Sequence, residues 1–175
     1  MLAAAAFAIA AAENAVPATA PADFTAGVIN GFNPALDVRS LMQECFTPDQ
    51  KIADDTDAFI AAIKAKDFGN IKSIIMGDEP LAIKDTEACM TDPKYAQIRK
   101  AEEFQQALVE KAMADPDWQL HALKGVKGHL DEIKQSAQDA IAAWDAGNYY
   151  GAGQKIGSID KLVFTFWETN SAFLQ

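Results

Sequence analysis

Few residues in this chain of 175 residues have the type and spacing that catalysis or metal binding requires. The two histidines, His121 and His129, are eight positions apart, so on one helix they lie about 12 Å apart, too far to bind one metal ion. The two cysteines, Cys45 and Cys89, can form a disulfide, and neither could then act as a nucleophile. The sequence therefore predicts no catalytic residue and no metal ligand, and we expect a protein that is not an enzyme.

The segment 151–157 resembles a dinucleotide-binding loop because it has glycines at positions 151, 153 and 157. Such a loop follows a strand that directs the next helix at the pyrophosphate, whereas a long helix is predicted before this segment. We favour a structural role, in which Gly153 and Gly157 lie on one face of the last helix and let a neighbour approach closely. The sequence therefore predicts no cofactor.

Two acidic motifs also lack the context that would give them a function. Residues 67–69, Asp-Phe-Gly, spell the magnesium-binding motif of protein kinases, but the accompanying kinase motifs are absent. Asp54, Asp55 and Asp57 form an acidic cluster inside a predicted helix, without the loop oxygens and glycine turn of a calcium site. We expect a solvated acidic face there.

The elements that position these residues are all predicted to be helices. Apolar residues recur at helical spacing, and no pair of alternating runs joined by a tight turn indicates strands. The connections are short, which favours antiparallel neighbours. We predict an all-α, antiparallel multi-helix bundle of six to eight helical segments, with helices over 24–30, 34–45, 48–66, 70–77, 79–90, 93–114, 116–146 and 149–167. One domain then covers 24–167, followed by a C-terminal tail over 168–175.

Cap residues mark the expected ends of these helices. An N-cap residue precedes proline at Asn33-Pro34, Thr47-Pro48, Asp92-Pro93 and Asp115-Pro116. Gln50 is placed to complete a capping box with Thr47, and Gly147 is a typical helix terminator. Gly125 and Gly128 indicate a bend, or a close helix contact, inside the longest helix.

The apolar stripes predict which side chains form the core. The stripe on the longest helix includes Leu120, Leu123, Leu130, Ile133, Ala137, Ala140, Ile141 and Trp144. The residues for which we specifically predict burial are Ile60, Ile63, Leu130, Ile141 and Ile156.

Cys45 and Cys89 end two predicted helices, and a helical hairpin between them returns the chain close to its starting point. This arrangement is compatible with the Cα separation of a disulfide, which we predict. The alternative is two buried free thiols.

Composition and charge narrow the class of protein. Half of the residues are apolar and 23% are charged, the balance of a soluble globular protein. The net charge of −10 argues against binding to nucleic acid or to anionic lipid headgroups. No apolar run is long enough to span a membrane.

The first twelve residues favour an exported protein. Residues 1–12 are uncharged and end in Ala10-Ala11-Ala12, which is typical of a signal peptide and its cleavage site, although no basic residue precedes the apolar run. We predict a signal peptide over 1–12, a flexible leader over 13–23, and a secreted protein or one in the lumen of the secretory pathway. A flexible alanine-rich leader without a targeting role is the alternative.

The C-terminal quarter is rich in aromatic residues. They form a possible interaction surface for a protein partner, a second copy or an apolar ligand; core packing is the alternative. The residues of this predicted surface are Trp144, Tyr149, Tyr150, Phe164, Phe166, Trp167, Phe173 and Leu174.

An ordered set of motifs supports a family resemblance. Gly27-Val-Ile-Asn-Gly31-Phe32 precedes Cys45, a helical hairpin, Cys89, a long helix and the segment 143–157, Ala-Trp-Asp-Ala-Gly-Asn-Tyr-Tyr-Gly-Ala-Gly-Gln-Lys-Ile-Gly. This set is similar to that of a largely uncharacterised family of small secreted helical proteins from ciliates and other protists. The resemblance covers residues 24 to about 165, and it implies export, a disulfide and an all-α fold but no activity.

We therefore predict a non-catalytic interaction or structural protein, with self-assembly as one form of that role. The alternative is a carrier that holds a lipid-like ligand inside the helical bundle. An enclosed apolar cavity would favour the carrier, and a solidly packed bundle would favour the interaction protein.

Overall fold

The computed structural model describes residues 16–66, 89 and 91–172, and every regular element among them is helical. This confirms the predicted all-α class. The elements are α2 (Ala20–Phe32), α3 (Arg39–Cys45), α4 (Gln50–Ala65), the 3-10 turn η2 (Pro93–Tyr95), α7 (Ala96–Met113), α8 (Trp118–Gly128), α9 (Leu130–Asp145) and α10 (Tyr149–Ala172).

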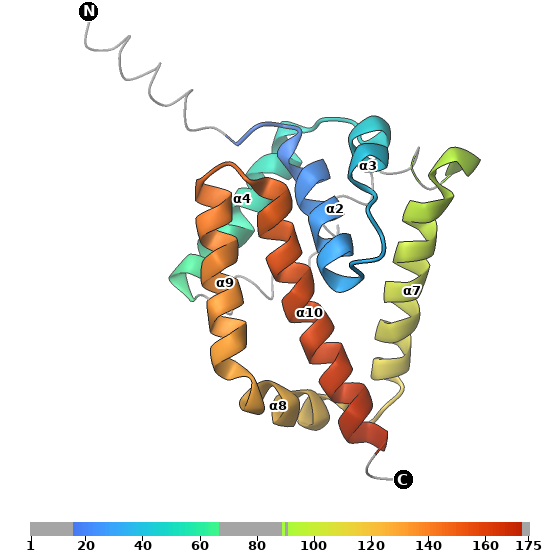
Figure 1. Cartoon of the computed structure of the whole chain (residues 1–175), viewed down its shortest axis with the longest axis vertical. Coiled ribbons are helices and arrows are strands. Elements are labelled where there is room, and N and C mark those ends of the chain that lie inside the picture. The colour runs from blue at the N-terminus through green and yellow to red at the C-terminus, as the bar shows by residue number, and fades with distance from the viewer. Residues whose placement is uncertain (1–15, 67–88, 90, 173–175) are drawn as a thin grey trace, which may run out of the picture.

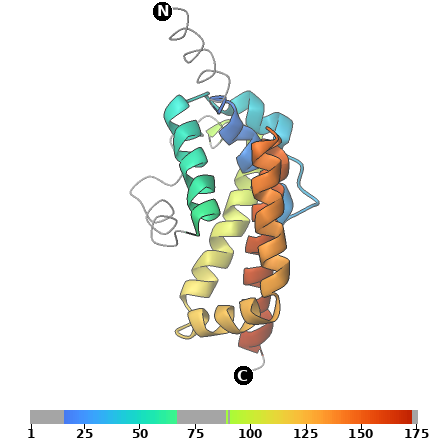
Figure 2. The ribbon, with the colours of Figure 1, turned by 90° about the vertical axis from the view of Figure 1, so that its left-hand side faces the viewer.

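The longest of these helices, α10, organises the bundle. It contacts α2 most extensively, and it also packs against α9 and α8 (Figure 1). The two views show α8 lying across the end of the bundle where α10 finishes, at a steep angle to the other helices (Figure 2). The molecule therefore has a closely packed centre, at the crossing of α2 and α10, and an end that is closed by one short helix.

Glycines bring α2 and α10 into backbone contact. A Cβ atom on Gly27 or Gly31 would overlap the carbonyl oxygens of α10, and one on Gly153 or Gly157 would overlap those of α2. The close approach predicted for Gly153 and Gly157 is confirmed. Beside this crossing, the side-chain amide of Gln154 donates a hydrogen bond of 2.8 Å to Asn30 Oδ1, which fixes the register of the two helices.

Two apolar clusters flank this crossing. One contains Phe24, Phe59, Ile60, Trp144 and Ala152, and the other contains Val38, Met42, Ile98 and the two cysteines. The predicted disulfide between Cys45 and Cys89 is confirmed, with Cα atoms 5.2 Å apart. It joins the end of α3 to the residues that precede α7.

Several helices begin at other residues than the sequence predicted. α2 begins at Ala20, within the segment predicted to be a flexible leader, with Pro21 in its first turn. The second helix starts at Arg39 rather than at residue 34, because Asn33 ends α2 and its side chain accepts a hydrogen bond from the Ala35 amide.

The capping box predicted for Thr47 and Gln50 is wrong. Asp49 is the N-cap of α4, and its side chain accepts hydrogen bonds from the amides of Lys51 and Ile52. The Gln50 side chain instead donates to the carbonyl oxygen of Val16. A carboxylate one residue later therefore caps this helix in place of the threonine.

Two other predicted caps are confirmed. Asp92 caps the 3-10 turn η2, where its side chain accepts a hydrogen bond from the Lys94 amide. Gly147 has φ +72°, the left-handed conformation that glycine adopts without strain after a helix.

The helix predicted over 116–146 is two helices, separated at His129. Gly128 is the last residue of α8, so the glycines did mark a bend. Leu130 is 45% exposed and its predicted burial is wrong, because it is the first residue of α9 at the end of the bundle. Ile60 is fully buried as predicted, whereas Ile63, Ile141 and Ile156 are half-buried.

The remaining predicted segments lie wholly or partly outside the described residues. The predicted helices over 70–77 and 79–90 lie outside the described residues except for Cys89, as does the predicted signal peptide over 1–12. α10 continues through Ala172, into the segment 168–175 that was predicted as a tail.

Candidate functional site

Trp144 belongs to the core, not to a surface. Its side chain is 4% exposed, and its ring contacts the rings of Phe24 and Tyr149 at centroid distances of 5.5 and 4.8 Å. Its indole N–H donates a hydrogen bond of 2.9 Å to Asp57. The sequence prediction that placed Trp144 on an interaction surface is therefore corrected. The amphipathic face of α9 turns this residue inward, against α2 and α4.

The two tyrosines of the predicted surface are half-buried against the same core. Burial raises the pKa of Tyr149 above its ordinary value, and it does the same for Tyr150, with a further contribution from Asp37. The Arg39 guanidinium lies 4.8 Å from the centroid of the Tyr150 ring. Tyr150 thus helps to hold α3 against α10.

The other aromatic residues of that prediction remain untested. Phe164, Phe166 and Trp167 are on α10, and the described side chains of this helix end before them. Phe173 and Leu174 lie outside the described residues.

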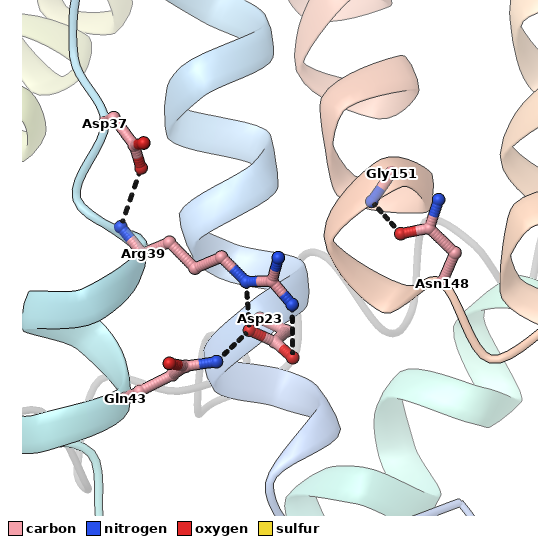
Figure 3. A network of polar contacts seen from close by, with 6 residues as sticks. All are labelled: Asp23, Asp37, Arg39, Gln43, Asn148 and Gly151. Carbon is pink, nitrogen blue, oxygen red and sulfur yellow. Dashed lines mark hydrogen bonds and ion pairs between the residues drawn. The ribbon is translucent and has the colours of Figure 1, made fainter.

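A polar network centred on Asp23 joins the first turn of α2 to α3 (Figure 3). Arg39 donates to both carboxylate oxygens of Asp23, with Nε at 2.8 Å and the second contact at 3.3 Å. Gln43 donates a third hydrogen bond, of 2.7 Å, and the pairing with Asp23 raises the Arg39 pKa. Both oxygens of Asp23 accept hydrogen bonds from α3, so this carboxylate holds α3 on α2.

A shallow cavity of about 250 Å³ adjoins this network. It is lined by Thr19, Ala22, Asp23, Gln43, Phe46 and Pro48. Its volume is below the ~300–1,000 Å³ of typical ligand sites, and it lies at the surface rather than inside the bundle. It therefore does not provide the enclosed apolar space that a lipid carrier needs.

Each histidine is paired with a carboxylate. His121 is buried and its Nδ1 lies 2.9 Å from Asp115, while His129 Nδ1 lies 3.1 Å from Glu132. No group of three or more potential metal ligands occurs among the described residues. The same residues include no helix long and apolar enough to cross a membrane.

Among the described residues, Asp160 on α10 has a strongly raised pKa. Burial raises its pKa from 3.8 to about 7, and no charged neighbour contributes to the shift. An acid in such surroundings is mostly protonated in mildly acidic solution and pays a desolvation cost when it ionises.

One face of α8 combines exposed leucines with charged residues. Leu120 and Leu123 are 52% and 65% exposed, and Lys124 and Lys127 follow at the spacing that completes one helical face. Asp117, the exposed N-cap residue of α8, begins this row. We call these five residues the α8 face.

The opposite side of α8 faces the protein, as the burial of His121 shows. The helix packs against α10 and α9 through that side. Leu120 and Leu123 are therefore exposed on a helix that is held in place by its other face, and not on a helix that has detached from the bundle.

The acidic residues Asp115, Asp131 and Glu132 beside the α8 face contact neighbouring side chains, while the charged groups of the face itself make no such contact among the described residues. Asp115 pairs with His121, Glu132 with His129, and Asp131 with Lys134 at 3.7 Å. Within the described part of the chain, Asp117, Lys124 and Lys127 take part in no such ion pair. The α8 face thus combines exposed apolar side chains with charges that can pair with a partner.

Sequence reasoning missed this surface because it assigned Leu120 and Leu123 to the core stripe of one long helix. The available signal was the charge pattern. Lys124 lies four positions after Leu120, and Lys127 lies four positions after Leu123, so both lysines place charge on the same helical face, which is unusual for a core stripe.

Comparison of the chain with protein-family models, with curated proteins and with solved structures found no match.

Proposed function

We propose that this protein is a non-catalytic interaction protein of the secretory lumen or cell exterior, and that the α8 face is its binding surface. The observation that carries the proposal is the exposure of Leu120 and Leu123 on a helix whose other side is firmly packed. Large apolar side chains on one exposed face are typical of protein interfaces.

The size of the apolar contribution fits a specific but reversible interaction. Complete burial of a leucine side chain contributes about 1.5–3 kcal/mol, and roughly half of each leucine is still exposed. Covering Leu120 and Leu123 would therefore contribute about 2 kcal/mol together. Charge pairing with Asp117, Lys124 and Lys127 would add specificity.

A non-catalytic role is supported by the state of the polar groups. The Asp23 carboxylate is occupied by Arg39 and Gln43, and the two cysteines are joined in a disulfide. His121 is buried against Asp115, which leaves it poorly placed to reach a substrate. These groups stabilise the fold and do not converge on one open cleft.

The compartment is inferred from the disulfide and the leader. A disulfide between Cys45 and Cys89 is consistent with an oxidising compartment, where such bonds persist. Residues 1–12 add the features of a signal peptide. The family resemblance noted in the sequence implies export as well. The intact mass of the native protein tests this, since cleavage after the predicted signal peptide removes residues 1–12.

Site-specific photo-crosslinking tests the binding surface. A photoreactive amino acid replaces Leu123, and in a matched control it replaces Ala61, an exposed residue of α4. We expect crosslinked products in the native setting from position 123 and not from position 61. Equal yields from both positions, or none from position 123, would contradict the proposal.

A further inference from the structure

The α8 face has an order of residues that makes it complementary to itself. Along the helix, an acidic residue at the N-terminal end, Asp117, is followed by Leu120 and Leu123, and then by the basic residues Lys124 and Lys127. When two such helices lie antiparallel, the acidic end of one meets the basic end of the other, and the leucines meet between them.

The spacing allows both ion pairs to form at once. Asp117 and Lys127 are ten residues apart, or about 15 Å along a helix axis. In an antiparallel pair that places Asp117 opposite Lys127, the two-fold axis generates a second, identical pair at the other end. In this register Leu120 lies opposite Lys124 and next to Leu123 of the second copy. The lysine stem and the second leucine then cover it.

We propose that a second copy of this chain docks on the α8 face, with the two α8 helices antiparallel about a two-fold axis. The proposal rests on the proposed function, because it names the partner of that surface. The exposed carboxylate and ammonium groups, which make no ion pair among the described residues, then pair across the axis.

A second copy accounts for the α8 face better than a membrane does. An anionic bilayer would attract Lys124 and Lys127, but it would repel Asp117 and a chain of net charge −10. A lipid surface also gives no reason for an acidic group at one end of the face and basic groups at the other. That polarity makes the face complementary to itself in an isologous dimer.

The contact is small, so the dimer should be weak and reversible. Two helices of eleven residues that meet along one face bury less than the ~1,200 Å² of a standard stable interface. Repulsion between two chains of charge −10 opposes association further. We therefore expect a monomer–dimer equilibrium that depends on protein concentration, not an obligate dimer.

Sedimentation equilibrium with charge-reversed variants tests the arrangement. Lys127→Glu places two like-charged pairs in the dimer, and so does Asp117→Lys. We expect each variant alone to dimerise at least ~10-fold more weakly than the original chain, a change of about 1.4 kcal/mol. Lys100→Glu on α7, which changes the net charge by the same amount as Lys127→Glu at an exposed position away from α8, is the control for that variant and should dimerise as the original chain does.

A mixture of the two variants gives the sharper result. In a heterodimer of Lys127→Glu with Asp117→Lys, both end pairs are again of opposite charge, so the mixture should dimerise at least ~10-fold more strongly than either variant alone. The comparison holds even if each substitution slightly destabilises α8, because the mixture and the separate variants contain the same altered helices. Helical content measured by circular dichroism confirms that both variants fold.

Three results would overturn the proposal. The original chain could remain monomeric up to about 1 mM, the weakest association of interest. The mixture could associate no better than its components. The original chain could bind phosphatidylcholine–phosphatidylserine vesicles through Lys124 and Lys127 while it stays monomeric in solution. If the chain is monomeric yet position 123 crosslinks to another polypeptide, the second copy is wrong and the proposed function stands.

Discussion

The crossing of α2 and α10 and the α8 face both consist of residues at helical spacing. The residues of the crossing are buried within the chain, whereas those of the α8 face are exposed. At the crossing, glycines four residues apart on each helix let the two backbones touch, and nothing of that face is left for a partner. On α8, leucines three residues apart remain half exposed or more. Glycines at this spacing indicate that two helices of the same chain are in contact, whereas exposed leucines at the end of the bundle are available to contact another molecule.

The largest effect on stability is expected from adding a side chain at the crossing of α2 and α10, which tests whether the two helices are in backbone contact there. In Gly153→Val, the added carbons overlap the carbonyl oxygen of Phe24, and the two helices must separate. We expect a loss of more than about 3 kcal/mol in the free energy of unfolding, measured by chemical denaturation.

Gly128→Ala is the matched control for that experiment. A Cβ atom on Gly128, the last residue of α8, meets nothing within 4 Å. The free energy of unfolding should change by less than about 1 kcal/mol. If the two substitutions have similar effects, the crossing is not the tight centre of the molecule.

Removing the disulfide is expected to have the next largest effect. Cys45 and Cys89 are 44 residues apart, and closing a loop of this size stabilises a protein by about 2–4 kcal/mol. The double substitution Cys45→Ala and Cys89→Ala should lower the free energy of unfolding by that amount. Dimerisation through α8 should be unaffected at temperatures where the variant is folded. A parallel loss of dimerisation would show that the α8 face depends on this distant link.

Asp160→Asn tests whether burial of the Asp160 carboxyl on α10 makes its ionisation unfavourable. With a folded-state pKa near 7 against an ordinary value of 3.8, the folded protein keeps a proton that the unfolded chain releases. Stability should therefore fall as the pH rises from about 4 to about 7, and it should stay lower above pH 7. Asparagine removes this dependence. The variant should be more stable than the original chain at pH 8, by about 1–2 kcal/mol because Asp160 keeps some solvent access.

Asp139→Asn is the control with the opposite sign. Hydrogen bonds from Gln135 and Lys155 lower the Asp139 pKa, so its contribution is present at neutral pH and is lost as the pH falls through its folded-state pKa. Thermal unfolding of both variants between about pH 2 and pH 8 separates the two effects, because the Asp139 contribution changes below its ordinary pKa of 3.8 and the Asp160 contribution changes above it. If Asp160→Asn shows the same slope with pH as the original chain, the Asp160 carboxyl is not desolvated.

The smallest effect on stability is expected on the α8 face itself. Leu123→Ser removes an exposed side chain, so the free energy of unfolding should change by less than about 0.5 kcal/mol. Its dimerisation should nevertheless weaken, because the leucines lie between the two ion pairs. A large loss of stability would mean that Leu123 packs within its own chain.

The sequence predicted the helical class, the disulfide and the close approach at Gly153 and Gly157, since these depend on local spacing and on cysteine pairing. It did not identify Gly27 and Gly31 as the facing residues, because the pairing of helices distant in sequence is not encoded locally. It indicated a bend near Gly128 but did not divide the chain into two helices at His129, because the apolar stripes on the two sides have the same period.

The candidate site was the harder prediction for a physical reason. Aromatic residues such as Trp144 serve equally well in cores and in interfaces, and only the orientation of α9 within the bundle decides between them. Conversely, Leu120 and Leu123 fit a core stripe until the turn at His129 places α8 across the end of the molecule.

Hydroxyl-radical footprinting of the native protein, compared with diluted monomer, tests the central claim most directly. Our account predicts that Leu120 and Leu123 are oxidised several-fold more slowly in the native assembly, while the oxidation of Ile29, a buried residue of α2, is equally slow in both samples. Equal oxidation of Leu120 and Leu123 in the two samples would contradict the assignment of the α8 face as the binding surface.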